Sequence, residues 1–105
     1  MSTYQSPATL KRWSTVQTVL CTTVSTAITN AIGSQTYVVR LVANTACHVA
    51  IGDGAQTATT TNAYVPANFP EYVTVTPGQR LSAIRASSNG RGTATDGTLN
   101  VTELT

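Results

Sequence analysis

The chain has 105 residues, of which 41% are hydrophobic and 10% charged, with a formal net charge of +2. This length suits one domain with one core and is too short for two. The charged fraction lies well below the roughly 25% usual in globular proteins, and the few basic residues are dispersed, so we expect no nucleic-acid partner. No apolar run is long enough for a transmembrane helix, so we expect no membrane partner either. Thr fills about a fifth of the positions, which favours β-strands.

Residues 1–12 are predicted to form a flexible arm ahead of a single domain at 13–105. The first nine residues are polar, include Pro7 and show no periodicity. The stretch after Lys11 and Arg12 has the outline of a signal peptide, but Ser and Thr interrupt its apolar run. We therefore expect the protein to be made and assembled in the cytoplasm of its host cell.

Residues 13–32 carry an apolar residue at every fourth position: Val16, Leu20, Val24, Ile28 and Ile32. These positions share parity, so one face of a strand would hold them. The stretch is too long for one ordinary strand. We expect two strands, with a break near residues 21–25 and an end at the turn of Gly33 and Ser34.

The middle of the chain contains the clearest strand, at 35–44. Its nearly continuous apolar character from Tyr37 to Ala43 is typical of a central strand covered on both faces. A second strand is predicted at 46–51, ended by a glycine-rich turn. Residues 55–62 are a polar, low-complexity stretch and are predicted to form an exposed loop.

The chain from residue 64 onward alternates short strands with turn residues. A brief strand at 64–65 is followed by an extended segment between two prolines and by a strand at 71–76. Pro77 and Gly78 occupy the central positions of a type II turn, which leads into a return strand at 80–86. After a long loop at 87–97, residues 98–104 alternate again, with Leu99 and Val101 on one side. The total of seven or eight short strands predicts an all-β, single-domain antiparallel β-sandwich or jelly-roll.

Side chains that could support catalysis or bind a metal are scarce. The single histidine, His48, follows Cys47, and neighbours along a strand point to opposite faces, so the two cannot form a thiolate–imidazole pair. Two cysteines and one histidine are too few for a usual zinc site, and no calcium-loop, phosphate-loop or nucleophile-elbow motif occurs. We expect no enzyme activity, cofactor, metal or small-molecule substrate. Cys21 and Cys47 are expected to be buried thiols, with a disulfide between them as the alternative.

Trp13 is the strongest candidate for an interface residue. It is the only tryptophan, it lies beside Lys11 and Arg12, and Trp and Arg are enriched in binding hot spots. The alternative interpretation is that Trp13 caps the core of its own domain. Further interface candidates are aromatic, namely Tyr4, Tyr64 and Phe69.

Three segments resemble small β-rich structural proteins from the virions of tailed bacteriophages. They are VRLVANTACHVAIG at 39–52, YVPANFPEYVTVTPGQ at 64–79 and GTLNVTEL at 97–104. The resemblance implies a virion component of the capsid decoration, or cement, type. Such a protein would lie on the outer capsid surface, bind between subunits of the major capsid protein and self-associate as a dimer or trimer. A head–tail connector, a tail or fibre component, and a sugar-binding β-sandwich module remain alternatives.

Overall fold

The computed structural model describes residues 12–88, 92 and 94–105. The predicted arm, apart from Arg12, therefore lies outside the described residues. The described part of the chain forms eight strands and contains no helix. The strands are β1 (Trp13–Cys21), β2 (Thr26–Ala27), β3 (Val38–Ala43), β4 (Cys47–Gly52), β5 (Ala63–Val65), β6 (Glu71–Thr74), β7 (Arg80–Arg85) and β8 (Gly97–Leu104).

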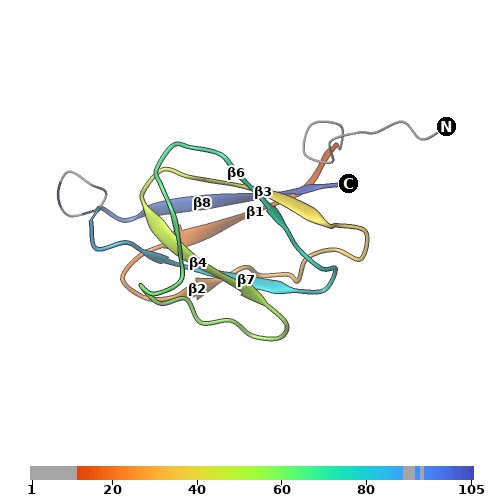
Figure 1. The fold of residues 1–105 in the computed structure, drawn as a ribbon, viewed down its shortest axis with the longest axis horizontal. Helices are drawn as coiled ribbons and strands as arrows, with labels where there is room; N and C mark the ends of the chain where they lie inside the picture. Colours follow the sequence, from red (N-terminus) through yellow and green to blue (C-terminus); the bar gives the residue numbers. More distant parts are fainter. Residues whose placement is uncertain (1–11, 89–91, 93) are drawn as a thin grey trace.

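The strands form two antiparallel sheets that pack as a sandwich (Figure 1). Sheet A has the order β1-β8-β3-β6, and sheet B has the order β2-β7-β4-β5. The first strand pairs with the last, the second with the seventh, the third with the sixth and the fourth with the fifth. This is the pairing of one long hairpin rolled into two layers, which is the jelly-roll arrangement. The predicted all-β sandwich is confirmed, and the strand order selects the jelly-roll.

The core lies between the sheets and is built from alternate residues of the inner strands. Val39 and Leu41 of β3 face Leu81 of β7, and all three side chains are almost completely buried. Burying a side chain of this size contributes about 1.5–3 kcal/mol relative to leaving it exposed. The prediction of a central strand near residues 35–44 is confirmed, since β3 lies between β8 and β6. The expected cover on both faces is not found, because Arg40 and Val42 on the outer face are only partly buried.

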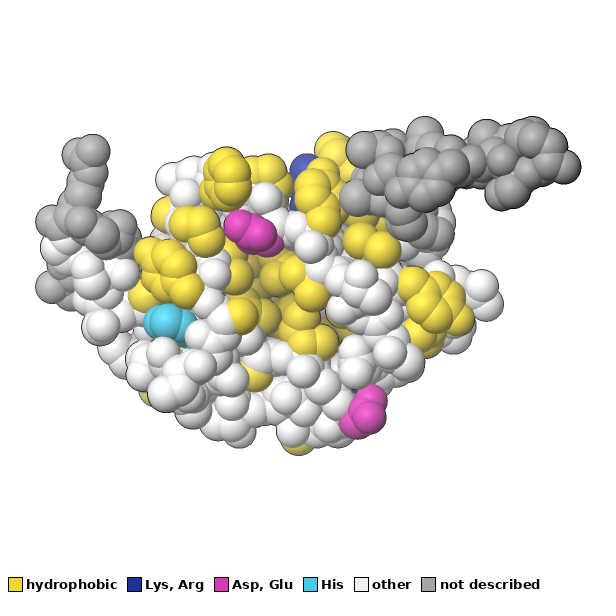
Figure 2. Space-filling view, viewed as in Figure 1, with side chains coloured by type: hydrophobic (Ala, Val, Ile, Leu, Met, Phe, Trp, Pro, Cys, Tyr) yellow, Lys and Arg dark blue, Asp and Glu magenta, His cyan; other side chains and the backbone are white. Residues whose placement is uncertain are grey.

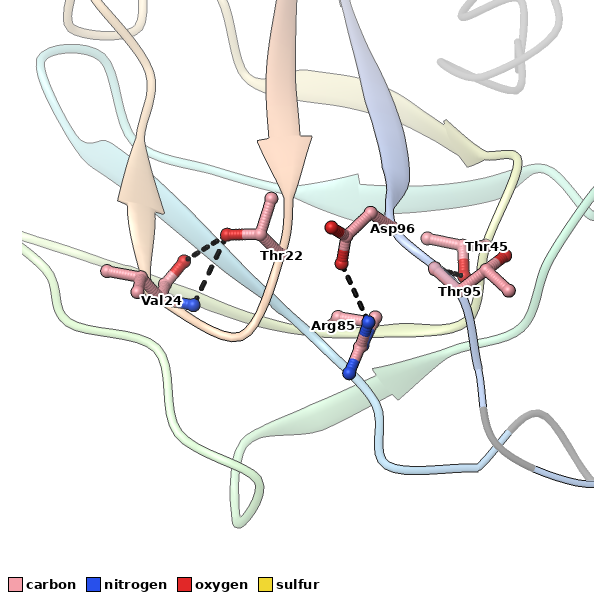
Figure 3. A network of polar contacts seen from close by, with 6 residues as sticks. All are labelled: Thr22, Val24, Thr45, Arg85, Thr95 and Asp96. Carbon is pink, nitrogen blue, oxygen red and sulfur yellow. Dashed lines mark hydrogen bonds and ion pairs between the residues drawn. The ribbon is translucent and has the colours of Figure 1, made fainter.

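The break predicted within residues 13–32 is also confirmed. Strand β1 ends at Cys21 and β2 begins at Thr26. In the turn between them, the Thr22 hydroxyl accepts a hydrogen bond from the Val24 amide at 3.2 Å and donates one to the Val24 carbonyl at 3.3 Å (Figure 3). Such side-chain bonds to nearby backbone are typical of threonine in turns.

The apolar repeat of residues 13–32 does not form one face. Val16 and Leu20 share a face of β1, as expected, but it is the outer face of sheet A, whereas Val19 faces the core. Ile28 and Ile32, beyond the break, are buried. Parity shows which residues share a face but not which face is covered.

The connection between β6 and β7 is the predicted turn, but the two strands it joins are not paired with each other. Gly78 has a φ of +86°, and the Gln79 amide donates to the Thr76 carbonyl at 3.1 Å. The expected return strand is wrong in one respect: β6 pairs with β3 in sheet A, and β7 lies between β2 and β4 in sheet B. In a rolled hairpin these consecutive strands lie in opposite sheets. The turn between them therefore does not indicate which strand each of them pairs with.

The loop at 55–62 is only partly the exposed segment that its composition predicts. The Ser82 hydroxyl donates to the Gln56 carbonyl at 2.6 Å, and the Ala58 amide donates to Ser25 Oγ at 2.8 Å. Ala58 is only 2% exposed, and Ser82 and Ala50 are buried although they lie on the outer face of sheet B. The loop therefore covers part of that face.

One end of the sandwich is closed around the start of β8. A Cβ atom on Gly97 would lie 2.1 Å from Asn44 Oδ1, which also accepts a hydrogen bond from the Thr98 amide at 2.8 Å. Beside it, Arg85 and Asp96 form an ion pair at 2.7 Å (Figure 3). The close contact explains the glycine at the start of β8. Of the predicted loop at 87–97, the Asn89-Gly90 turn lies outside the described residues.

Candidate interaction face on sheet A

The outer face of sheet A brings together large apolar side chains from β1 and β6 and an arginine from β3. Strand pairing places four residues in one row across the sheet: Val16, Thr102, Arg40 and Tyr72. Trp13 lies at the start of β1, and Leu20 lies further along the same strand. We call Trp13, Val16, Leu20, Arg40 and Tyr72 the sheet A patch.

The apolar members of the sheet A patch are open to solvent. The exposed fraction is 66% for Trp13, 57% for Leu20, 52% for Val16 and 48% for Tyr72. Figure 2 shows a dark-blue basic side chain among yellow apolar ones at the upper margin of the molecule, above sheet A, and few charged side chains elsewhere on the visible face. A gathering of exposed apolar side chains is a usual mark of an interaction site.

Arg40 lies among these apolar side chains. Its Cζ atom is 4.5 Å from the centroid of the Trp13 ring, which is a cation–π contact. Its Nε atom is buried and has no hydrogen-bond partner. Buried donors in proteins are nearly always partnered, so this one requires an explanation.

Within the part of the chain that the structure describes, no carboxylate is paired with Arg40. The ion pair between Arg85 and Asp96 lies near the far end of β1 from Trp13. Glu103 is buried on the core side of β8, where it accepts hydrogen bonds from the Thr36 hydroxyl and the Gly33 amide. The charge of Arg40 is therefore unbalanced on its own face.

The structure places the interface candidates at several locations. Trp13 lies on the outer face of sheet A rather than in the core, and the neighbouring Arg12 exchanges two backbone hydrogen bonds with Thr105, at 3.0 and 2.9 Å. Tyr64 lies on β5 of sheet B and contacts His48 edge to face, with ring centroids 5.5 Å apart. Phe69 is exposed in the connection between β5 and β6. Tyr4 and Lys11 lie outside the described residues.

Sequence reasoning missed four members of the sheet A patch. Val16 and Leu20 were visible as an apolar pair of equal parity, but they were not considered as surface residues. Arg40 was visible as the one charged residue in the apolar run of β3. Tyr72 had no local signal, because its place beside Arg40 depends on the pairing of β6 with β3.

The cysteines and the histidine do not form a common site. Cys21 and Cys47 are both buried and free, and they come from opposite sheets. A hydrogen bond with the Cys21 thiol, together with burial, raises the pKa of Cys47 well above its ordinary value, so this thiol remains protonated and unreactive at neutral pH. His48 is on the opposite side of β4, as predicted, where its Nδ1 lies 2.9 Å from the Asn62 carbonyl.

Two features of other kinds of site are absent from the described residues. No three of their His, Cys, Asp or Glu side chains are grouped so that they could hold a metal ion. No helix among them has the length and apolar character needed to cross a membrane. Comparison of the whole chain with protein-family models, curated proteins and solved structures gave no match. The sheet A patch therefore carries the functional argument.

Proposed function

We propose that the protein is a non-enzymatic structural component of a tailed-phage virion, which decorates and stabilises the capsid by binding between major capsid subunits on the outer surface. The observation that supports this proposal is the sheet A patch, in which exposed apolar side chains surround an arginine without a carboxylate partner. Three of its five members, Trp13, Arg40 and Tyr72, are of the residue types that contribute most to binding at protein interfaces.

The comparison with sheet B strengthens the case for a protein partner. The outer face of sheet B is partly covered by the chain's own loop, through the bonds of Ser82 and Ala58. Trp13 and Leu20 on sheet A remain more than half exposed. Burying such side chains against a partner would remove their apolar surface from water, and this favours binding.

Self-association as a dimer or trimer is part of the same proposal. Each contact with the capsid would then be repeated within one oligomer, and linked contacts bind far more tightly than a single one. The proposal includes assembly in the cytoplasm of the bacterial host and involves no nucleic acid, membrane, cofactor or small-molecule substrate. Light scattering of the purified chain should give an oligomer mass; a monomer at high concentration would contradict this part.

The number of copies per particle tests the location in the virion. Heads and tails of the phage that encodes the chain would be separated and analysed by quantitative mass spectrometry. We expect the protein in tailless heads, in copies on the scale of the major capsid protein. Its presence in tails alone, or as a single ring of copies per particle, would instead support the tail or head–tail connector alternative.

A second test links binding to the sheet A patch. Trp13→Ala should abolish binding to heads purified without the protein, while the far-ultraviolet circular dichroism spectrum stays unchanged. Tyr37→Ala is the matched control, because Tyr37 is an exposed aromatic residue outside the sheet A patch, and it should bind heads normally. Equal binding by both variants would contradict the role of the patch.

The sugar-binding alternative has one observation in its favour. Trp13 and Tyr72 are exposed aromatic side chains on the same sheet face, and aromatic rings can stack on sugars. A glycan array separates the alternatives: binding of a glycan that is lost in Trp13→Ala, together with absence of the chain from heads, would replace the capsid proposal by a sugar-binding one.

A further inference from the structure

We infer that the sheet A patch is built to receive a carboxylate: an Asp or Glu of the partner protein lies against Arg40 while apolar partner residues pack on Trp13 and Val16. This inference rests on the proposed function in taking the partner to be a protein surface. It adds the chemistry that this surface must present.

The guanidinium group of Arg40 lacks hydrogen-bond partners within the described chain. A guanidinium group has five N–H donors in one plane. In this structure Nε is buried without an acceptor, and no described residue forms an ion pair with Arg40. The contact with the Trp13 ring satisfies the charge in part, but a ring face does not fill the donor positions as an oxygen atom does. Arg40 is therefore partly desolvated and lacks its usual partners.

The strands beside β3 do not supply a hydrogen-bond acceptor for Arg40. Thr102, the cross-strand neighbour on β8, donates its hydroxyl to Asn100 Oδ1 at 2.7 Å. Tyr72, the neighbour on β6, is half exposed and forms no hydrogen bond with Arg40. No described residue supplies an acceptor to Arg40, so in the proposed complex the partner supplies it. A carboxylate fits best, since its two oxygens match the planar donors of arginine.

A second copy of the chain does not suit the sheet A patch. Docking two sheet A patches around a twofold axis would bury both Arg40 side chains in one interface, because a twofold interface uses the same surface twice. The patch offers no described carboxylate to separate these charges. Desolvating like charges is unfavourable, so the proposed self-association must use another surface.

Phosphate is the other common anionic partner of arginine. Proteins that bind nucleic acid group several Lys and Arg side chains on one face. Arg40 instead contacts the Trp13 ring and lies between Thr102 and Tyr72 in the cross-strand row. A single cation within an apolar surface matches a protein carboxylate flanked by apolar residues.

The test uses two small probes that differ only in charge. The full chain, labelled with ¹⁵N, would be titrated with 3-phenylpropionate and with 3-phenylpropionamide, which share an aromatic ring and differ in carrying a carboxylate or an amide. The readouts are the side-chain Nε–H resonance of Arg40 and the indole N–H resonance of Trp13. We expect the carboxylate to bind about fivefold more tightly than the amide, as for a partly exposed ion pair, with both resonances shifting.

Matched variants assign the preference to Arg40. Arg40→Gln should reduce the affinity ratio of the two probes to near one, and Arg80→Gln, which removes an arginine from β7 of sheet B, should leave it unchanged. If Arg40→Gln fails to fold, Arg40→Lys retains the charge without the planar donors and should give an intermediate ratio. A ratio near one in the wild type, a ratio retained in Arg40→Gln, or shifts confined to other residues would each overturn the inference.

This experiment can fail independently of the proposed function. A charge preference at Arg40 in a chain that is absent from heads would leave the inference standing and refute the capsid proposal. A chain that decorates heads but shows no charge preference would support the capsid proposal and overturn the inference. Self-association that is lost in Trp13→Ala would also overturn the inference, because it would assign the patch to a second copy.

Discussion

The outer faces of the two sheets differ in what covers them. On sheet B, the loop at 55–62 lies against the strands, so that Ala50, Ser82 and Ala58 are buried. On sheet A, Trp13 and Leu20 are among the most exposed apolar residues of the described chain. A sandwich needs only its inner faces for a core, so an outer face can be sealed by the chain itself or kept open for a partner. In this protein the loop covers part of the outer face of sheet B. On sheet A, Thr102 and Leu104 of the outer face are buried, but Trp13, Val16 and Leu20 stay exposed.

The largest expected effect is on stability, from shortening a side chain on the inner face of sheet A. Leu41→Ala removes a fully buried side chain of β3 and should lower the free energy of unfolding by about 2–5 kcal/mol. Urea denaturation followed by circular dichroism would measure the change. An effect near zero would show that the core is not where β3 places it.

A charge introduced on each outer face should have opposite consequences. Ala58→Asp buries a carboxylate under the loop on sheet B and should destabilise the protein by about 2–3 kcal/mol. Val16→Asp, on the open face of sheet A, should change stability by less than about 0.5 kcal/mol while abolishing binding to heads. Equal destabilisation by the two changes would remove the distinction between the faces.

A milder change can weaken the contact between the loop at 55–62 and the outer face of sheet B. Ser82→Ala removes the hydroxyl that donates to the Gln56 carbonyl and should cost about 1 kcal/mol, with faster proteolysis within residues 53–62. Ser34→Ala, at an exposed turn position, is the control and should have no measurable effect. If both variants behave like the wild type, the hydrogen bond does not hold the loop in place.

The smallest expected effect is that of Leu20→Ala. This change is chemically identical to Leu41→Ala, but Leu20 is 57% exposed, so the free energy of unfolding should change by less than about 0.5 kcal/mol. Thermal unfolding of the two variants under the same conditions gives the comparison. A loss as large as that of Leu41→Ala would mean that Leu20 is covered in the isolated protein.

Much of the fold follows from local sequence signals. Branched side chains predicted the strands, Pro77 and Gly78 predicted a turn with positive φ, and the length of the stretch at 13–32 predicted the break between β1 and β2. These features depend on the preferences of a few neighbouring residues. Strand partners depend on contacts between distant segments, which is why the pairing of β6 with β3 was not predicted.

The candidate site was less predictable than the fold. Trp13 was found because its residue type is rare in this chain and frequent in interfaces. The sequence could not show that Val16 lies outside the sandwich, because alternation reports only a shared face. Nor could it show that Arg40 has no acceptor, because that depends on side chains brought near it by β8 and β6.

The pairing of β1 with β8 also sets the order of events during synthesis. Strand β8 lies between β1 and β3, so the row that joins Val16 to Arg40 cannot form until the last strand has left the ribosome. A chain that is cut short before Gly97 lacks the strand that holds the two halves of this row together. Incomplete products therefore lack the row of side chains on which the proposed binding depends.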